Sequence, residues 1–173
     1  MNTTRRSWML ALVLALPLGA AWAADISGKV VGVLDGDTID LLKGDRQTVR
    51  VRLAGIDAPE KRQAFGAEAK KALSDLVYGR DLVVSTDKAD RYGRAIGKLM
   101  LRGTDVNLEM VKRGFAWHYG RFESDQTATD RAAYRAAEVQ ARQRHLGLWR
   151  DADPMAPWDF RKHGHHAKGD ATE

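Results

Sequence analysis

Short runs of alternating hydrophobic and polar residues fill much of the first hundred positions, a pattern typical of half-buried β-strands. The alternation predicts five strands, over residues 27–34, 38–42, 48–53, 81–86 and 96–101. In the third of them Val51 and Leu53 alternate with Arg50 and Arg52. Because side chains of a strand point to opposite faces in turn, the two arginines are expected together on the face away from the core.

Helical spacing of apolar residues replaces the alternation in three other segments. The predicted helices cover residues 64–78, 104–112 and 127–145, each ending close to a glycine, and Thr104 is the expected N-cap of the second. Beyond Trp149 the chain becomes irregular, and Pro157-Trp158-Asp159-Phe160 is expected to dock its aromatic side chains on the domain. This order of elements predicts an α+β fold that is predominantly β: a closed five-stranded barrel of the OB-fold type, flanked by three helices. Such barrels commonly bind oligonucleotides.

The first 23 residues have the order of a secretory signal peptide. Arg5 and Arg6 precede an apolar run over residues 8–18, and Ala21-Trp22-Ala23 fits a cleavage site before Ala24. A buried N-terminal helix is the alternative. We therefore expect a signal peptide over 1–23, one domain over 24–151 and a C-terminal tail over 152–173, partly docked and then disordered. The mature protein is expected to be exported, either periplasmic or secreted, without stable membrane association, and monomeric.

The composition of the chain says little about which molecules the protein binds. The chain has 28 Lys plus Arg against 23 Asp plus Glu, and its net charge of +5 falls to +3 without Arg5 and Arg6, because residues 1–23 contain no acid. This modest excess is compatible with a polyanionic partner but does not demonstrate one. The chain has no cysteine, so stability in an oxidising compartment has to come from the core, the docked termini and a bound ion.

Candidate chemistry gathers at the ends of the predicted strands. Asp35-Gly36-Asp37-Thr38 follows the first strand, and Arg52 precedes Asp57-Ala58-Pro59-Glu60 by five positions. Each acidic segment alone fits an ordinary turn or strand exit. Together, paired carboxylates suit Ca²⁺ or Mg²⁺, arginines suit a phosphate, and a glutamate can take a proton from water. This combination is the equipment for hydrolysing a phosphodiester.

At this point the chain resembles the thermonuclease family, whose type member is staphylococcal nuclease, from about Val30 to Trp149. The motifs that carry the resemblance are Asp35-Gly36-Asp37-Thr38, Arg52 with Asp57-Ala58-Pro59-Glu60, Asp90-Arg91-Tyr92-Gly93-Arg94, Val106-Asn107, Gly114-Phe115-Ala116 and Gly147-Leu148-Trp149. The chain departs from the type member in having Ala58 in place of a threonine. It also has only five residues between Glu60 and Gly66, where the type member's loop is several residues longer.

The resemblance implies a set of metal ligands. Asp37 and Asp57 match the direct Ca²⁺ ligands, the backbone carbonyl of Ala58 matches a third, and Asp35 matches an acidic neighbour that acts through water. Because Ala58 would contribute only its main chain, the change from threonine is expected to spare this ligand.

The resemblance also implies the residues that act on the substrate. Glu60 matches the residue usually assigned as general base, and Arg52 and Arg94 match the two arginines that grip the scissile phosphate. Arg91 and Tyr92 match positions that line the nucleotide site. Tyr119, in an aromatic cluster, is a further candidate for substrate contact because aromatic side chains stack on bases.

The implied function is a Ca²⁺-dependent endonuclease that hydrolyses DNA and RNA, single-stranded or frayed. A metal-associated water would attack in line and leave 3′-phosphorylated products. One alternative is a nuclease-like barrel that binds single-stranded nucleic acid or protein without cutting it. Another is a barrel that binds sugars or peptides, which would leave the facing arginines and aspartates unexplained.

Overall fold

A closed barrel of five strands forms the centre of the molecule. The structure, a computed structural model, describes residues 24–169; the expected signal peptide, residues 1–23, lies outside them. The barrel strands are β1 (Ala24–Val33), β2 (Thr38–Leu42), β3 (Thr48–Leu53), β5 (Asp81–Ala89) and β6 (Ala95–Leu101). They are hydrogen-bonded in the order β3-β2-β1-β5-β6, and a parallel pairing of β3 with β6 closes the barrel. The predicted five-stranded OB-fold barrel is confirmed.

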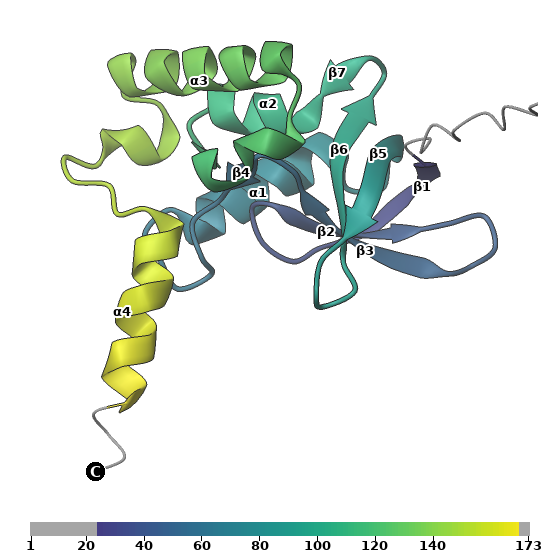
Figure 1. The fold of residues 1–173 in the computed structure, drawn as a ribbon, viewed down its shortest axis with the longest axis horizontal. Helices are drawn as coiled ribbons and strands as arrows, with labels where there is room; N and C mark the ends of the chain where they lie inside the picture. Colours follow the sequence, from purple (N-terminus) through teal and green to yellow (C-terminus); the bar gives the residue numbers. More distant parts are fainter. Residues whose placement is uncertain (1–23, 170–173) are drawn as a thin grey trace, which may run out of the picture.

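Helices lie mainly to one side of the barrel, where α3 runs across α2, while α4 extends away from the body (Figure 1). The helices are α1 (Gly66–Val77), α2 (Val106–Lys112), α3 (Ala128–Gln143) and α4 (Pro157–Gly169), with 3₁₀ turns η1 (Gly120–Asp125) and η2 (Gly147–Arg150). Three two-residue strands, β4 (Ile56–Asp57), β7 (Thr104–Asp105) and β8 (Trp117–His118), complete the fold. No helix among the described residues is long and apolar enough to cross a membrane.

The core lies inside the barrel and under the first two helices. Val51 and Leu53 of β3 are almost completely buried, while Arg50 is exposed and Arg52 is only partly covered. This is the separation of faces that the alternation in β3 predicts. Leu73 of α1 and further apolar side chains of α2 close the open side of the same core. Burial of these side chains is the main favourable term in folding. No disulfide adds to the stability that it provides.

Two helix starts show where local sequence decides the structure. The hydroxyl of Thr127 accepts a hydrogen bond from the amide of Asp130 (3.1 Å) and caps α3. The cap of α2, however, is Asp105 and not the expected Thr104: its carboxylate accepts from the amide of Leu108 (3.0 Å). Thr104 instead belongs to β7, which pairs with the end of β6. The extra strand moves the helix start by one residue.

Asn107 fastens the seam where the barrel closes. Its side chain is fully buried and donates to the carbonyls of Ala54 (3.0 Å) and Gly97 (3.1 Å), while its oxygen accepts from the amide of Leu99 (3.1 Å). Ala54 follows β3, and the other two residues belong to β6. One amide side chain therefore bonds backbone groups from both sides of the seam and helps to satisfy their hydrogen-bonding capacity.

We expect Asn107→Leu to lower the free energy of unfolding by about 2–4 kcal/mol, because a leucine of similar size leaves three buried backbone groups with a lost partner. Urea unfolding followed by tryptophan fluorescence measures this. Gln140→Leu, on the exposed face of α3, is the matched control and should change stability by less than about 0.5 kcal/mol. Equal unfolding midpoints for the two variants would contradict the role of Asn107.

Candidate active site

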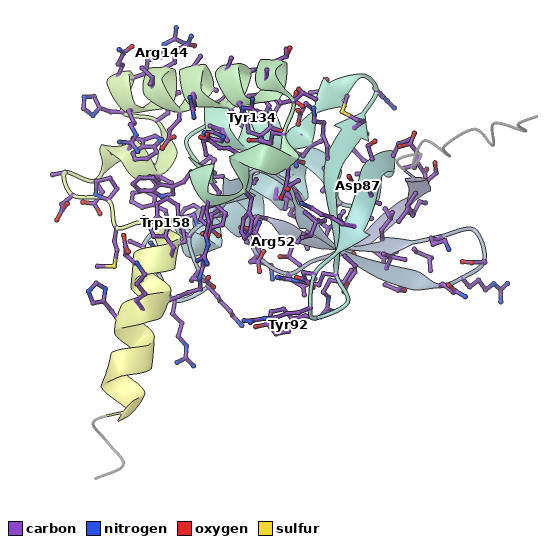
Figure 2. All side chains as sticks on the ribbon, in the orientation of Figure 1. Arg52, Asp87, Tyr92, Tyr134, Arg144 and Trp158 are labelled. Atoms are coloured by element: carbon purple, nitrogen blue, oxygen red, sulfur yellow. The ribbon has the colours of Figure 1, made fainter. Side chains whose placement is uncertain are left out.

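The guanidinium of Arg52 lies at the centre of the site. It forms ion pairs with Asp37 (3.0 Å) and Asp57 (2.8 Å), and it also donates to the backbone carbonyls of Leu53 and Ile56, both at 3.1 Å. Figure 2 shows Arg52 near the middle of the molecule, with Tyr92 at the tip of a hairpin and Trp158 on α4. The two aspartates that the sequence predicts as metal ligands thus lie against the two terminal nitrogens of one side chain.

A close approach of two turns brings the aspartates together. Gly36, between Asp35 and Asp37, packs so tightly that a Cβ there would lie 2.6 Å from the Cβ of Ala58. The approach lets the amide of Ala58 donate to Asp37 Oδ2 (2.7 Å). Asp35 stays at the rim, where its carboxylate accepts from the backbone amide of Asp37 (3.1 Å). Only glycine leaves enough space for the β1–β2 turn to meet the end of β4.

Burial dominates the electrostatics of Asp37, whose exposed fraction is 6%. Loss of hydration raises the pKa of Asp37 to about 7, and the nearby carboxylates of Asp35 and Asp57 act in the same direction, whereas Arg52 opposes the shift. Asp57 is even more deeply buried, at 1% exposed. Two buried carboxylates beside an arginine, one of them with a raised pKa, mark a candidate functional site.

Glu60 stands at the start of a tight turn, because the loop after it is short. Its amide donates to the side-chain oxygen of Gln63 (3.0 Å), and the amide of Gln63 donates back to the carbonyl of Glu60 (2.8 Å). Gly66 ends the turn, where a Cβ would lie 2.0 Å from that same carbonyl. The backbone of Glu60 is therefore well fixed. Its side chain is linked to Asp57 by one further residue, which the sequence pattern did not indicate.

That residue is Arg161 of α4. Its guanidinium donates to both carboxylate oxygens of Asp57 (3.2 and 2.7 Å) and to Oε1 of Glu60 (2.7 Å). These hydrogen bonds, first those to Asp57, raise the pKa of Arg161 above its ordinary value. The sequence predicted no helix in this segment; its one local signal is Pro157, which is favourable at the first position of a helix.

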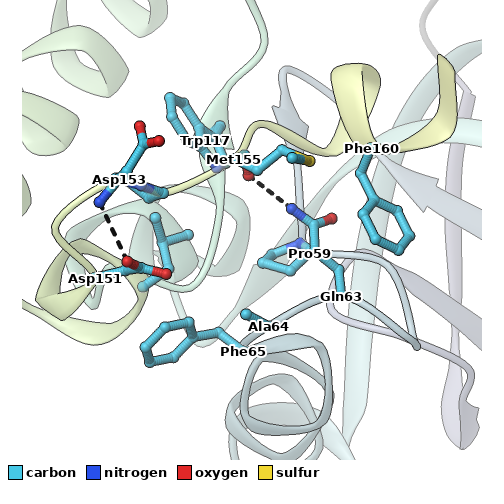
Figure 3. Close-up of a pocket in the computed structure, with 11 residues that line it drawn as sticks. Pro59, Gln63, Ala64, Phe65, Trp117, Asp151, Asp153, Met155 and Phe160 are labelled. Carbon is cyan, nitrogen blue, oxygen red and sulfur yellow. Dashed lines mark hydrogen bonds between the residues drawn. The ribbon is translucent and has the colours of Figure 1, made fainter. Parts of the chain in front are cut away.

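A pocket of about 220 Å³ separates the Glu60 turn from the C-terminal segment (Figure 3). Pro59 and Phe160 contribute apolar lining, and the Gln63 side chain donates to the carbonyl of Met155 (2.6 Å). Nearby, Trp158 stacks on Tyr119 with the ring centroids 5.3 Å apart. The segment before α4 is therefore hydrogen-bonded to the turn that carries Glu60, and the start of α4 packs on Tyr119.

The hairpin between β5 and β6 gathers three more predicted residues, but apart from the aspartates. Arg94 pairs with Asp90 (2.7 Å), and the guanidinium of Arg91 donates to the hydroxyl of Tyr92 (2.6 Å). Tyr92 is 67% exposed. Arg94 lies just before the β6 residues that pair with β3, so the hairpin adjoins Arg52, yet within the described residues no ion pair joins Arg94 to Asp37 or Asp57.

Tyr119 is likewise outside direct contact with the aspartates. Its amide donates to the carbonyl of Gly55 (2.9 Å), which places it beside the strand pair β4–β8, and its ring contacts Phe122 and Trp158. The predicted substrate-binding residues thus form two separate groups, one on the hairpin and one near α4.

The donor set is compatible with a hard divalent cation. Asp37, Asp57, Asp35 and the carbonyl of Ala58 offer only oxygen atoms, the ligands that Ca²⁺ and Mg²⁺ prefer. Among residues 24–169, no group of three or more acidic, histidine or cysteine side chains is close enough to hold an ion alone. An ion here would need water and phosphate oxygens to complete its coordination, which suits a metal that works on a bound phosphodiester.

The chain is similar in sequence to one protein family over much of its length. The family model described as "Staphylococcal nuclease homologue" matches residues 50–151, a segment that contains Arg52, Asp57, Glu60 and Arg94. The chain is 43% identical to a micrococcal nuclease of Shigella flexneri, over 87% of each chain. It is 42% identical to an uncharacterized endonuclease of Escherichia coli O157:H7, over 80% of this chain and 86% of that protein. It is also 40% identical to protein ParB of Escherichia coli, over 95% and 97% of the two chains. The match covers more than half of the chain and these relatives are similar over most of their length, so the chain belongs to the staphylococcal nuclease homologues, and its family supports a nuclease function.

Proposed function

We propose that the protein is an exported, Ca²⁺-dependent endonuclease that hydrolyses DNA and RNA and leaves 3′-phosphorylated ends. The observation that carries the proposal is the bridge by Arg52 between two buried carboxylates, Asp37 and Asp57. A nuclease that makes no covalent intermediate needs a phosphate-binding cation and an anionic metal site within reach of one phosphate. The bridge supports both requirements in one place.

Asp37, Asp57 and the carbonyl of Ala58 would hold the ion, with Asp35 acting through water. When bound, the ion would supply positive charge to a phosphate oxygen and orient a water for attack. Glu60 would accept a proton from that water as its oxygen bonds to phosphorus. The P–O5′ bond then breaks, and the 5′ oxygen takes a proton from solvent.

The two arginines stabilise the charge that develops on the phosphate. Arg52 is already at the site, and Arg94 reaches it by exchanging its partner Asp90 for the phosphate. Preorganised donors aimed at developing charge lower the barrier because they bind the transition state more tightly than the substrate. Both contacts are to the phosphate and none reads a base edge, which supports a nuclease without sequence preference.

The exposed hairpin and the aromatic residues near α4 support binding of flexible strands. Arg91 and Tyr92 offer a cation and a ring face to a nucleotide, and Tyr119 offers a second ring. Rings of this kind stack on unpaired bases of any type. We therefore infer single-stranded or frayed DNA and RNA as substrates.

Arg52→Ala should lower the rate of cutting by about 100-fold or more, since it removes a donor to the transition state. The measurement is digestion of circular single-stranded DNA with Ca²⁺ and with EDTA, with mass spectrometry of the product ends. Arg50→Ala is the control: it removes the same charge from the same face of β3, where Arg50 pairs with Asp40 (2.9 Å). Equal cutting by the two variants would place the activity elsewhere, and binding without cutting by the wild type would favour the non-catalytic barrel.

Calcium affinity should increase by about tenfold between pH 6 and pH 8, because Asp37 has a pKa of about 7 and must lose its proton to bind the ion. Calorimetric titration with Ca²⁺ in two buffers of different protonation enthalpy measures both the affinity and the released proton. Asp37→Asn should abolish the proton release. An affinity that stays constant over this range would contradict the assignment of Asp37.

The order of charged, apolar and small residues in positions 1–23 motivates the proposal of export. We expect the mature protein to begin at Ala24, as mass spectrometry of protein purified from an extracytoplasmic fraction would reveal. Retention of Met1 in a cell-associated protein would contradict it.

A further inference from the structure

The side chain of Glu60 depends on the C-terminal helix for its position. Among the side chains that the structure describes, Arg161 is the one hydrogen-bonding partner of the Glu60 carboxylate, and the same guanidinium also donates to both oxygens of Asp57. A glutamate on a surface turn otherwise samples several rotamers. A contact at 2.7 Å to a planar, always charged partner selects one of them.

We propose that Arg161 is a positioning residue of the nuclease reaction, which holds the Glu60 carboxylate beside Asp57 so that it faces the attacking water. The inference rests on the proposed function, in which Glu60 is the base and Asp57 a metal ligand. Because one rigid guanidinium touches both carboxylates, the distance between base and metal ligand is set by the geometry of that group.

The turn that carries Glu60 explains why a remote residue is needed. Only five residues separate Glu60 from Gly66, and they close on themselves through Gln63. Such a turn fixes the backbone but contributes no contact to the Glu60 carboxylate among the described residues. The segment that docks on the turn supplies the missing contact, through Met155 to Gln63 and through Arg161 to Glu60.

The start of α4 is held firmly enough for this role. Pro157 is buried, and Trp158 packs on Trp117 and stacks on Tyr119, with ring centroids 5.5 and 5.3 Å apart. Arg161 lies three residues after Trp158, so both side chains project toward the body from neighbouring positions on the helix. Fixing Trp158 therefore also limits the positions that Arg161 can take.

The same contact would inhibit the enzyme if Arg161 covered the site and had to leave before cutting. The exposure of Glu60 favours positioning, because its side chain remains 37% exposed with Arg161 in place. At Asp57, which is 1% exposed, the guanidinium would have to share the carboxylate with an ion. The two roles predict opposite effects of removing the guanidinium.

Arg161→Ala should lower kcat by about 10- to 100-fold with little change in KM, since a small displacement of a base costs rate and leaves substrate binding intact. The assay is Ca²⁺-dependent cutting of single-stranded DNA by the full chain. Guanidinium ion, at concentrations far below those that unfold proteins, should restore part of the lost rate. Arg135→Ala is the matched control, because Arg135 on α3 is exposed and pairs with Glu123 of η1 (3.1 Å), and this variant should keep full activity.

A double-mutant cycle with Glu60→Gln tests whether Arg161 acts through Glu60. In the Glu60→Gln protein, a further Arg161→Ala change should cost almost nothing, because the base is already lost. A full additional loss would mean that Arg161 acts through Asp57 or the phosphate and not through Glu60, and would overturn the proposal, as would unchanged or faster cutting by Arg161→Ala alone. If wild type itself does not cut with Ca²⁺, the proposed function fails; if wild type cuts and only the Arg161 effects are absent, this inference alone fails.

Discussion

The closure of the barrel between β3 and β6 is the constraint on which the site depends. It is the one parallel pairing in the barrel, and it joins Arg52 to Ile96 in register, two residues after Arg94. Without this seam the two arginines would belong to opposite edges of an open sheet. Parallel pairs are slightly less stable per residue than antiparallel ones, which is why the buried hydrogen bonds of Asn107 across the seam matter. The packing of the core and the placement of the charges are therefore decided by the same few backbone contacts.

Charge is concentrated on one side of that seam at a cost to folding. Asp37 and Asp57 are buried, and burial raises the pKa of Asp37 to about 7 even with Arg52 beside it. A chain optimised for stability alone would place apolar residues here, since buried ion pairs rarely outweigh the loss of hydration. Violations of this kind are expected where a protein binds something. A bound cation would relieve the repulsion among the carboxylates, so that part of this folding cost would become affinity for the ion.

Local pattern was sufficient for most of the fold and for part of the site. The bounds of β2 and β3 are those that the sequence predicts, and in β3 the alternation holds because Val51 and Leu53 face the core and Arg52 does not. The two-residue strands β4, β7 and β8 carry no periodic signal, since two residues cannot show a period, and β7 is why the cap of α2 is Asp105. Arg161 could not be predicted: it lies 104 positions from Asp57, and only tertiary packing of α4 brings the two together. Short-range rules find turns and faces, whereas contacts between distant segments need the folded molecule.

The C-terminal helix links two parts of the site that the barrel keeps apart. Trp158 covers Tyr119, a predicted substrate contact, and three residues later Arg161 holds Glu60. A strand that stacks on the exposed edge of this aromatic pair would therefore press on the same helix turn that orients the base. In the proposed reaction, binding of flanking nucleotides and alignment of Glu60 would be mechanically coupled through the four residues from Trp158 to Arg161.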